Sequence, residues 1–212
     1  MIIIDFDDTL FNTHKFKKDR LEALKDVGVS EEVYWETYLK ARNSNDGLFT
    51  YSNERHANVL EASGFEKEKV LEALEKTTSG LALKNTLSTG AESMLKEFKQ
   101  KFSTVILLSL GDPAFQELKT KGAGISEYFE RIFFVDDSKE HVMKNLLENH
   151  KPEQVWFVSD KVSETKKIVE QIPEIKSVLK VSKNIDISEY ENSGLPFFQT
   201  LEEITKYVTD NS

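Results

Sequence analysis

Short apolar runs, rich in β-branched residues, recur along this chain and are separated by stretches with helical spacing. The runs cover residues 2–4, 104–108, 131–135, 155–158 and 177–181. Strands that alternate with helices in this way favour βαβ units and a mainly parallel sheet flanked by helices. The sequence therefore predicts an α/β fold. Open sheets of this class bind their ligands at the carboxyl ends of the strands, so the residues that follow each run carry the most information about function.

An acidic cluster follows the first run directly. Asp5, Asp7 and Asp8 occur within four residues, and we expect Asp5 and Asp7 to point the same way. Two adjacent carboxylates repel each other unless a proton or a cation lies between them. A hard divalent cation such as Mg²⁺ fits this need. Acidic residues are also common in turns, so these residues alone leave both interpretations open.

The stretch 13–87 interrupts the strand and helix alternation. It contains no convincing strand and several amphipathic segments, which predicts a helical domain inserted into a core made of residues 1–12 and 88–212. The basic run of Lys15, Lys17, Lys18 and Arg20 is expected to be a solvated helix face, with substrate contact as the alternative. The aromatic residues of the insert fit either its core or the walls of a substrate site: Tyr34, Trp35, Tyr38, Phe49 and Tyr51.

A capping box of Thr89 and Glu92 is predicted to begin the helix that leads to the second strand.

Charge and composition restrict the partners that we expect. The 212 residues carry a formal charge of −9 and no cysteine, which opposes nucleic-acid and anionic-lipid binding and excludes disulfides and thiolate chemistry. No apolar stretch approaches the length of a membrane span, and Met1 leads directly into the first strand. We therefore expect a cytoplasmic protein that binds a small molecule, without a nucleic-acid or membrane partner.

Two later strand ends carry groups suited to a phosphate. Ser109 follows a buried run, and the amides before and at Gly111 can approach an anion closely because glycine has no side chain. Lys139 follows the next run, where its ammonium group can neutralise a phosphoryl oxygen. Lys144 is the alternative lysine, but it lies further from the strand end. Taken alone, a serine that ends a strand is more often a turn residue, and a lysine after a strand is usually solvated.

A further carboxylate follows the run at 155–158. Asp160 is expected to complete a metal site with Asp5, and Glu164 lies four residues later. Asp-Lys-Val-Ser-Glu is also a common helix start, because negative charge is favourable there. The order of all these groups along the chain therefore matters more than any one of them.

That order resembles the four motifs of the haloacid dehalogenase-like (HAD) superfamily, and the insert is similar to its C1-type helical cap. The resemblance implies a Rossmannoid core and an Asp5 nucleophile that forms an aspartyl-phosphate. Asp7 would act as general acid and then as general base. Mg²⁺ would be held by Asp5, the Asp7 backbone carbonyl and Asp160, and the phosphoryl group by Ser109 and Lys139.

The sequence departs from the family pattern at three positions. Asp8 and Ser159 stand where glycine is usual, and Glu164 replaces an aspartate. The extra methylene of Glu164 leads us to expect contact with the metal only through water. Dehalogenases of this superfamily lack the second aspartate, so Asp7 favours a Mg²⁺-dependent phosphatase of a small phosphorylated metabolite. A phosphomutase of the same superfamily and a catalytically silent, partner-binding relative remain alternatives.

Overall fold

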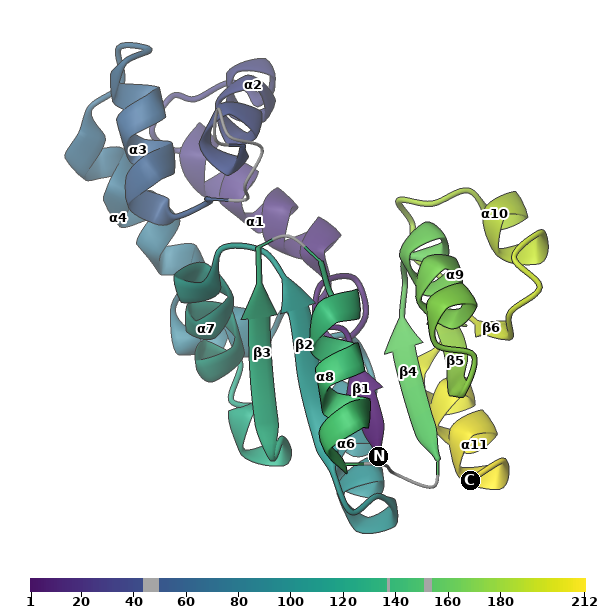
Figure 1. Cartoon of the computed structure of the whole chain (residues 1–212). Helices are drawn as coiled ribbons and strands as arrows, with labels where there is room; N and C mark the ends of the chain where they lie inside the picture. Colours follow the sequence, from purple (N-terminus) through teal and green to yellow (C-terminus); the bar gives the residue numbers. More distant parts are fainter. Residues whose placement is uncertain (44–49, 137, 151–153) are drawn as a thin grey trace.

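The computed structural model, which describes residues 1–43, 50–136, 138–150 and 154–212, contains a six-stranded sheet in the order β3-β2-β1-β4-β5-β6 (Figure 1). All neighbouring strands are parallel, and Ile3 of β1 pairs with Ile106 of β2 and Phe157 of β4. The strands are β1 (Ile2–Ile4), β2 (Val105–Leu110), β3 (Arg131–Val135), β4 (Val155–Ser159), β5 (Ile175–Lys180) and β6 (Phe197–Phe198). The predicted α/β class and its mainly parallel sheet are confirmed.

Helices occupy the connections between the strands. In the first part of the chain they are α1 (Thr13–Lys25), α2 (Glu31–Arg42), α3 (Asn53–Glu61), α4 (Lys67–Thr77), α5 (Gly80–Lys84) and α6 (Ala91–Lys101). The remaining helices are α7 (Pro113–Gly122), the 3-10 turn η1 (Ser126–Tyr128), α8 (Glu140–His150), α9 (Val162–Gln171), α10 (Ile187–Glu191) and α11 (Leu201–Asp210). No helix in the described ranges is long and apolar enough to cross a membrane.

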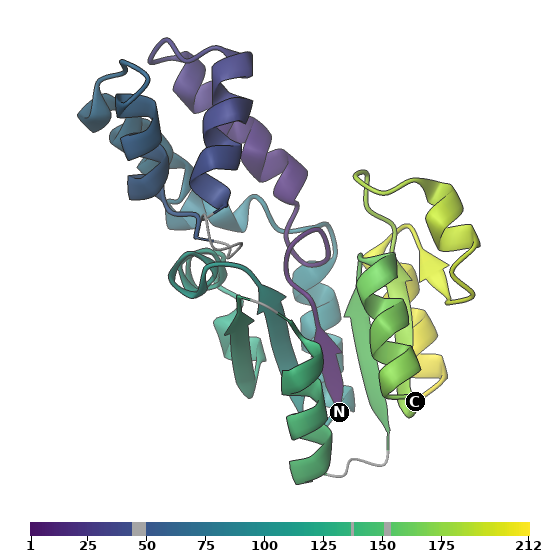
Figure 2. The ribbon, with the colours of Figure 1, turned by 45° about the horizontal axis from the view of Figure 1, so that its top comes forward.

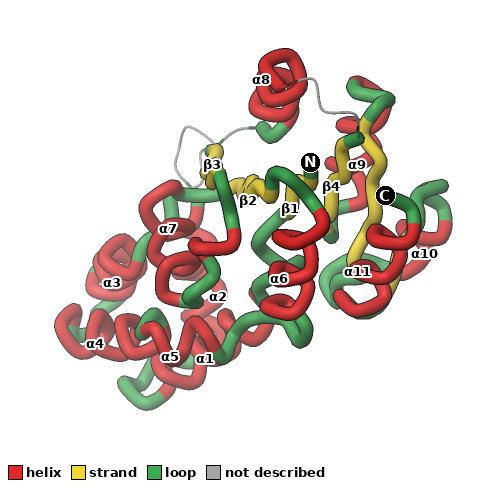
Figure 3. The backbone as a smooth tube through the Cα atoms, turned by 90° about the horizontal axis from the view of Figure 1, so that it is seen from below, coloured by secondary structure: helices red, strands yellow, loops and turns green. Residues whose placement is uncertain are grey.

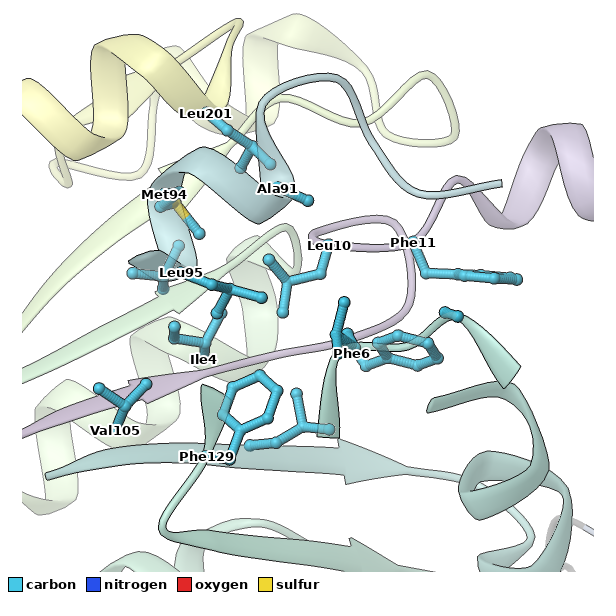
Figure 4. Packing of buried hydrophobic residues seen from close by; sticks show 14 of the residues in the cluster. Ile4, Phe6, Leu10, Phe11, Ala91, Met94, Leu95, Val105, Phe129 and Leu201 are labelled. Atoms are coloured by element: carbon cyan, nitrogen blue, oxygen red, sulfur yellow. The ribbon is translucent and has the colours of Figure 1, made fainter. Parts of the chain in front are cut away.

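Both faces of the sheet are covered by helices (Figure 3). Alternate residues of each strand point to opposite faces, so Ile3 belongs to the cluster under α8 and α9, whereas Ile4 belongs to the cluster under α6, α7 and α11. Figure 4 shows Ile4 packed close to Leu95 of α6. The short strand β1 is therefore buried on both faces, which explains its uninterrupted run of isoleucines.

The insert stands beyond the carboxyl ends of β2 and β3 (Figure 1, Figure 2). Helices α1 to α4 share a hydrophobic cluster of their own, whereas Leu83 of α5 belongs to the core cluster. The two segments that join the insert to the core lie side by side. The Asn12 amide donates to the Thr86 carbonyl at 2.9 Å, and the Ser88 amide donates to the Leu10 carbonyl at 2.8 Å. The division into a core and a cap over 13–87 remains a prediction.

Two local predictions are wrong. Helix α6 begins after Gly90, whose φ of 85° places it in the left-handed region, and no side chain caps the helix. Thr89 therefore lies outside the helix and forms no capping box with Glu92. Arg20, expected on a solvated face, is fully buried because Tyr51, Asn53 and Thr77 supply hydrogen-bond acceptors inside the insert.

Candidate active site

Asp5 directly follows β1, the strand at which the strand order of the sheet changes direction. Its neighbours in the sheet are β2 on one side and β4 on the other, and the Asp5 amide donates to the Val158 carbonyl at 2.8 Å. This is the topological switch point at which α/β sheets open a crevice for ligands. Only 2% of Asp5 is exposed, so the carboxylate lies at the base of that crevice.

Three donors hold the Asp5 carboxylate. The Phe6 amide donates to Oδ1 at 2.8 Å, and the Ser159 hydroxyl donates to Oδ2 at 3.1 Å. Lys139 Nζ lies 2.7 Å from Oδ2 and 2.9 Å from Glu164 Oε2. Burial opposes the charge of Lys139, but Asp5 and Glu164 outweigh that effect and raise the pKa of the lysine. Lys139 is therefore a cation at neutral pH, fixed beside Asp5.

The structure separates the two candidate lysines. Lys139 is completely buried, whereas Lys144 is exposed and donates to Gln171 Oε1 at 2.9 Å. Glu164 contacts Lys139 in this arrangement. Among the predicted site residues, the structure thus brings Asp5, Lys139 and Glu164 into direct contact.

Asp160 carries the clearest sign of a cation site. It is 3% exposed, and its Oδ1 atom has no hydrogen-bond partner among the described residues. Burial and the nearby charge of Asp5 raise the pKa of Asp160 to about 8. A buried carboxylate in this state is satisfied by a proton or by a cation. No group of three or more histidine, cysteine or carboxylate side chains suited to a metal occurs in the described ranges.

The pair of carboxylates formed by Asp5 and Asp160 fits Mg²⁺. Mg²⁺ is usually bound by one or two protein carboxylates and retains several waters, and its ligands are oxygens. Asp5 and Asp160 supply two carboxylates at adjacent strand ends. The chemistry of these donors therefore suits Mg²⁺ better than Zn²⁺, which prefers nitrogen and sulfur ligands.

Ser109 has an unused hydroxyl. The residue lies in β2, is completely buried, and its Oγ has no hydrogen-bond partner among the described residues. The expectation that the Gly111 amide faces an anion is wrong, because this amide donates to the Val135 carbonyl at 2.8 Å and extends the pairing of β2 with β3. Ser109 therefore keeps its place as a candidate phosphate ligand without help from that amide.

Side chains of α7, the helix that follows β2, bind the carboxylate of Asp7. Lys119 and Gln116 of α7 donate to its carboxylate, with Lys119 Nζ 2.7 Å from Oδ1 and Gln116 Nε2 2.7 Å from Oδ2. The Thr13 hydroxyl donates to Oδ1 at 3.0 Å. Burial alone would raise the pKa of Asp7, but the Lys119 charge and these hydrogen bonds outweigh it and lower the pKa. Asp7 is consequently ionised in the resting protein.

The sequence comparison agrees with this constellation. A family model for haloacid dehalogenase-like hydrolases matches residues 1–165, which include the acidic cluster, Ser109, Lys139 and Asp160. The chain belongs to the haloacid dehalogenase-like hydrolases. No significantly similar sequence is found among curated proteins.

Solved structures of HAD-like hydrolases share the fold over almost the entire chain. One, from Burkholderia xenovorans LB400, has a TM-score of 0.76 at 17% identity and covers 99% of this chain and 96% of its own. The HAD hydrolase YfnB from Bacillus subtilis, bound to magnesium, has a TM-score of 0.63 at 15% identity, covering 99% and 97%. A protein assigned as a β-phosphoglucomutase, from Thermotoga maritima, has a TM-score of 0.66 at 17% identity, covering 99% and 98%.

Further similar structures include a dehalogenase and a phosphoglycolate phosphatase assigned by prediction. At these identities the likeness shows the fold alone. It does not choose between phosphate esters and halides as substrates.

Sequence reasoning missed Gln116 and Lys119 in this HAD-like site. A signal was present: these residues and Phe115 recur at helical spacing on the inward face of α7, where two polar residues need partners. Ser159 was noted only as a departure from glycine, whereas its hydroxyl contacts Asp5.

A cleft of about 160 Å³ lies between the insert and the core, beside Gln116 and Lys119. The core contributes Asp7, Gln116 and Lys119 to its wall. The insert contributes cationic and aromatic residues: Phe16, Lys17, Tyr38, Arg42 and Tyr51. Two of the five aromatic residues singled out in the sequence therefore line the cleft, Tyr34 is buried in the insert, and Phe49 lies outside the described residues.

Proposed function

We propose that this HAD-like hydrolase is a Mg²⁺-dependent phosphatase that acts on a small phosphate ester through an aspartyl-phosphate. The observation that carries the proposal is the placement of Asp7, a second carboxylate beside the cleft and two residues from Asp5. A displaced halide leaves without a proton, whereas an alkoxide does not. A carboxylate held by three side chains at this position has a use in phosphate transfer and none in dehalogenation.

In the first step, an oxygen of Asp5 attacks phosphorus and the bond from phosphorus to the ester oxygen breaks. Asp7, which must first take up a proton as its contact with Lys119 loosens, gives that proton to the departing oxygen, so the products are an alcohol and a mixed anhydride on Asp5. Lys139 and the Ser109 hydroxyl hold the oxygens of the transferring group, because Lys139 contacts Asp5 and Ser109 carries an unpartnered hydroxyl in the neighbouring strand β2.

In the second step, water attacks the same phosphorus and the anhydride bond breaks. Asp7, now ionised, takes the proton from water, and the products are inorganic phosphate and the original Asp5 carboxylate. Splitting one displacement into two allows one carboxylate to serve as acid and then as base.

Asp5 and Asp160 would hold Mg²⁺, with the Asp7 carbonyl and water completing its shell. The ion, when bound, offsets negative charge on the phosphoryl oxygens in both displacements. The unpartnered Oδ1 of Asp160 supports this assignment.

The insert serves as a cap in this proposal. Its residues form one wall of the cleft and the Asp7 side forms the other, so the leaving group lies between the two. Closing such a cleft limits access of water to the site, which also determines whether the aspartyl-phosphate is hydrolysed or passed to another hydroxyl.

The test measures hydrolysis of p-nitrophenyl phosphate with Mg²⁺ and with EDTA, using the natural protein, Asp5→Asn and Asp7→Asn. We expect Mg²⁺-dependent phosphate release that Asp5→Asn abolishes. Because p-nitrophenolate leaves without protonation, Asp7→Asn should give a burst of one product equivalent followed by slow turnover. Turnover that survives Asp5→Asn would contradict the proposal, and isomer formation from a sugar phosphate without phosphate release would favour a mutase.

A further inference from the structure

We propose that the substrate's leaving group carries a second anionic group, a carboxylate, that Lys17 of the cap binds. This inference rests on the proposed phosphatase function and names its substrate class. Lys17 lies on α1 and lines the cleft that Asp7 also lines.

Lys17 is half-buried, lines the cleft and forms no ion pair with a carboxylate in the described part of the chain. Its Nζ lies 5.3 Å from the centre of the Tyr38 ring, which also lines the cleft. Lys15, on the same helix, is instead paired with Asp19. Burial, aided by the charge of Arg42, lowers the pKa of Lys17 more than Asp8 and Asp7 raise it. An anion placed beside it would compensate for that lost solvation.

The acidic residues of the cleft are already engaged by other groups. Asp7 is neutralised by Lys119, and Asp112 accepts the Phe115 amide at 2.9 Å as the N-cap of α7. Asp8 turns its carboxylate to Asn184, whose Nδ2 donates to Oδ2 at 3.0 Å. Each of the cleft's three carboxylates therefore accepts a hydrogen bond from a group other than Lys17.

A second buried cation adds to the positive potential of this wall. Arg20 lies behind Tyr51 and donates from Nη2 to the Tyr51 hydroxyl at 2.6 Å, and its remaining contacts are neutral acceptors and ring faces. No carboxylate pairs with it within the described ranges. An uncompensated guanidinium in a low-dielectric wall acts over several ångströms and favours anions in the adjoining cleft.

The cleft walls limit the rest of the leaving group. Tyr38, Tyr51 and Phe115 supply aromatic surface, and the cleft volume is about 160 Å³. These features fit a few carbon atoms between two anionic ends. The combined chemistry is a compact phosphate ester with a second anion at its far end.

The experiment compares two substrates of nearly equal shape, ω-carboxyalkyl phosphates and the corresponding ω-carbamoylalkyl phosphates, with chains of two to four carbons. We expect the natural protein to show a kcat/KM at least 10-fold higher for one carboxylate than for its amide. Lys17→Met should bring that ratio close to one. The matched control is Lys18→Met on the exposed neighbouring position, which should leave both the ratio and p-nitrophenyl phosphate hydrolysis unchanged.

The outcomes separate the two proposals. If p-nitrophenyl phosphate is hydrolysed but the ratio is near one in the natural protein, or if the ratio survives Lys17→Met, the second anion site is disproved. If no phosphate ester is hydrolysed at all, the proposed function itself fails, and the inference fails with it.

Discussion

Lys119 approaches both carboxylate oxygens of Asp7, with its Nζ 2.7 Å from Oδ1 and 2.9 Å from Oδ2. The lysine is 4% exposed and its Nζ lies over the rings of Phe6 and Phe11, each centred 5.2 Å away. A cation so enclosed keeps Asp7 in one orientation and in its ionised form. Proton donation by Asp7 then requires this contact to loosen when substrate binds.

Replacing Lys119 with Met should raise the pKa of Asp7, because burial would no longer be opposed by a neighbouring charge. The limb of kcat/KM that falls as Asp7 loses its proton should move to higher pH, and kcat should fall about 10-fold or more as Asp7 loses its orientation. The measurement is a pH profile with an alkyl phosphate. Lys121→Met, which removes a surface pair with Glu117, is the control. An unmoved limb in Lys119→Met would show that the pair does not set the protonation of Asp7.

Ser109→Ala should reduce activity without reducing stability. The Ser109 hydroxyl is buried and has no partner in the described structure, so its removal costs no internal hydrogen bond. Loss of a bond to a charged phosphoryl oxygen should weaken inhibition by vanadate or phosphate about 10-fold. Ser177→Ala removes a second unpartnered hydroxyl, in β5, and should leave both properties unchanged. A large loss of unfolding free energy in Ser109→Ala would contradict this account.

Gly111→Ala should impair catalysis through Gln116. A Cβ at Gly111 would lie 2.5 Å from Gln116 Nε2, the atom that donates to Asp7. The side chain must then move, and Asp7 loses one of its donors. Gly64→Ala has a comparable left-handed backbone at φ 94° but no neighbour within 4 Å, so it should affect stability alone. Equal activity in the two variants would show that the Gln116 contact is dispensable.

We expect His56 to lower the free energy of unfolding of the protein as the pH becomes acidic. Its ring lies between the Tyr51 and Thr37 hydroxyls, and burial, reinforced by Arg20, lowers the pKa of His56 to about 3. Between about pH 6.5 and pH 3 the unfolded chain therefore binds a proton that the folded chain does not. The free energy of unfolding should fall by up to about 1.4 kcal/mol per pH unit from this residue as pH decreases.

Urea denaturation of the natural protein and of His56→Gln at several pH values measures the effect. The difference between them should shrink as pH falls below about 6.5, since Gln removes the titrating group. His141→Gln, at an exposed position, should retain the natural slope. Parallel curves for the natural protein and His56→Gln would exclude a neutral buried histidine.

Binding of Mg²⁺ should release a proton near pH 7. The pKa of Asp160, raised to about 8, leaves the carboxyl largely protonated without metal, and a metal ligand must be ionised. Calorimetric titration in buffers of different ionisation enthalpy should show close to one proton released at pH 7 and less at pH 9. Asp160→Asn should abolish the release, and the same proton count in that variant would assign it to another group.

The fold and the strand-end residues could be predicted from the sequence because both depend on local patterns. A buried strand is recognisable from its run of apolar residues, and its carboxyl end is then fixed within a residue or two. Asp5, Ser109 and Asp160 occupy such positions, whereas Lys139 lies in the connection between β3 and α8. Their assembly follows once the strands are parallel.

Contacts that depend on the rotation of helices could not be predicted. Lys119 reaches Asp7 only because α7 presents one particular face to the cleft. The Gly111 amide forms a hydrogen bond with the neighbouring strand, and the sequence does not reveal that pairing. Arg20 was expected on the surface because charged residues rarely lack solvent. Its burial depends on three acceptors from distant segments that meet only in the folded insert.

Strand β1, which precedes the proposed nucleophile Asp5, has no sheet partner nearby in the sequence. Ile2 pairs with Val105 on one side and with Trp156 on the other. During synthesis, β1 must therefore wait for more than a hundred residues before its first neighbour emerges, and longer for the second. Such distant pairing slows folding and leaves an apolar strand edge temporarily exposed. Strand β1 is thus among the last elements to reach its final surroundings.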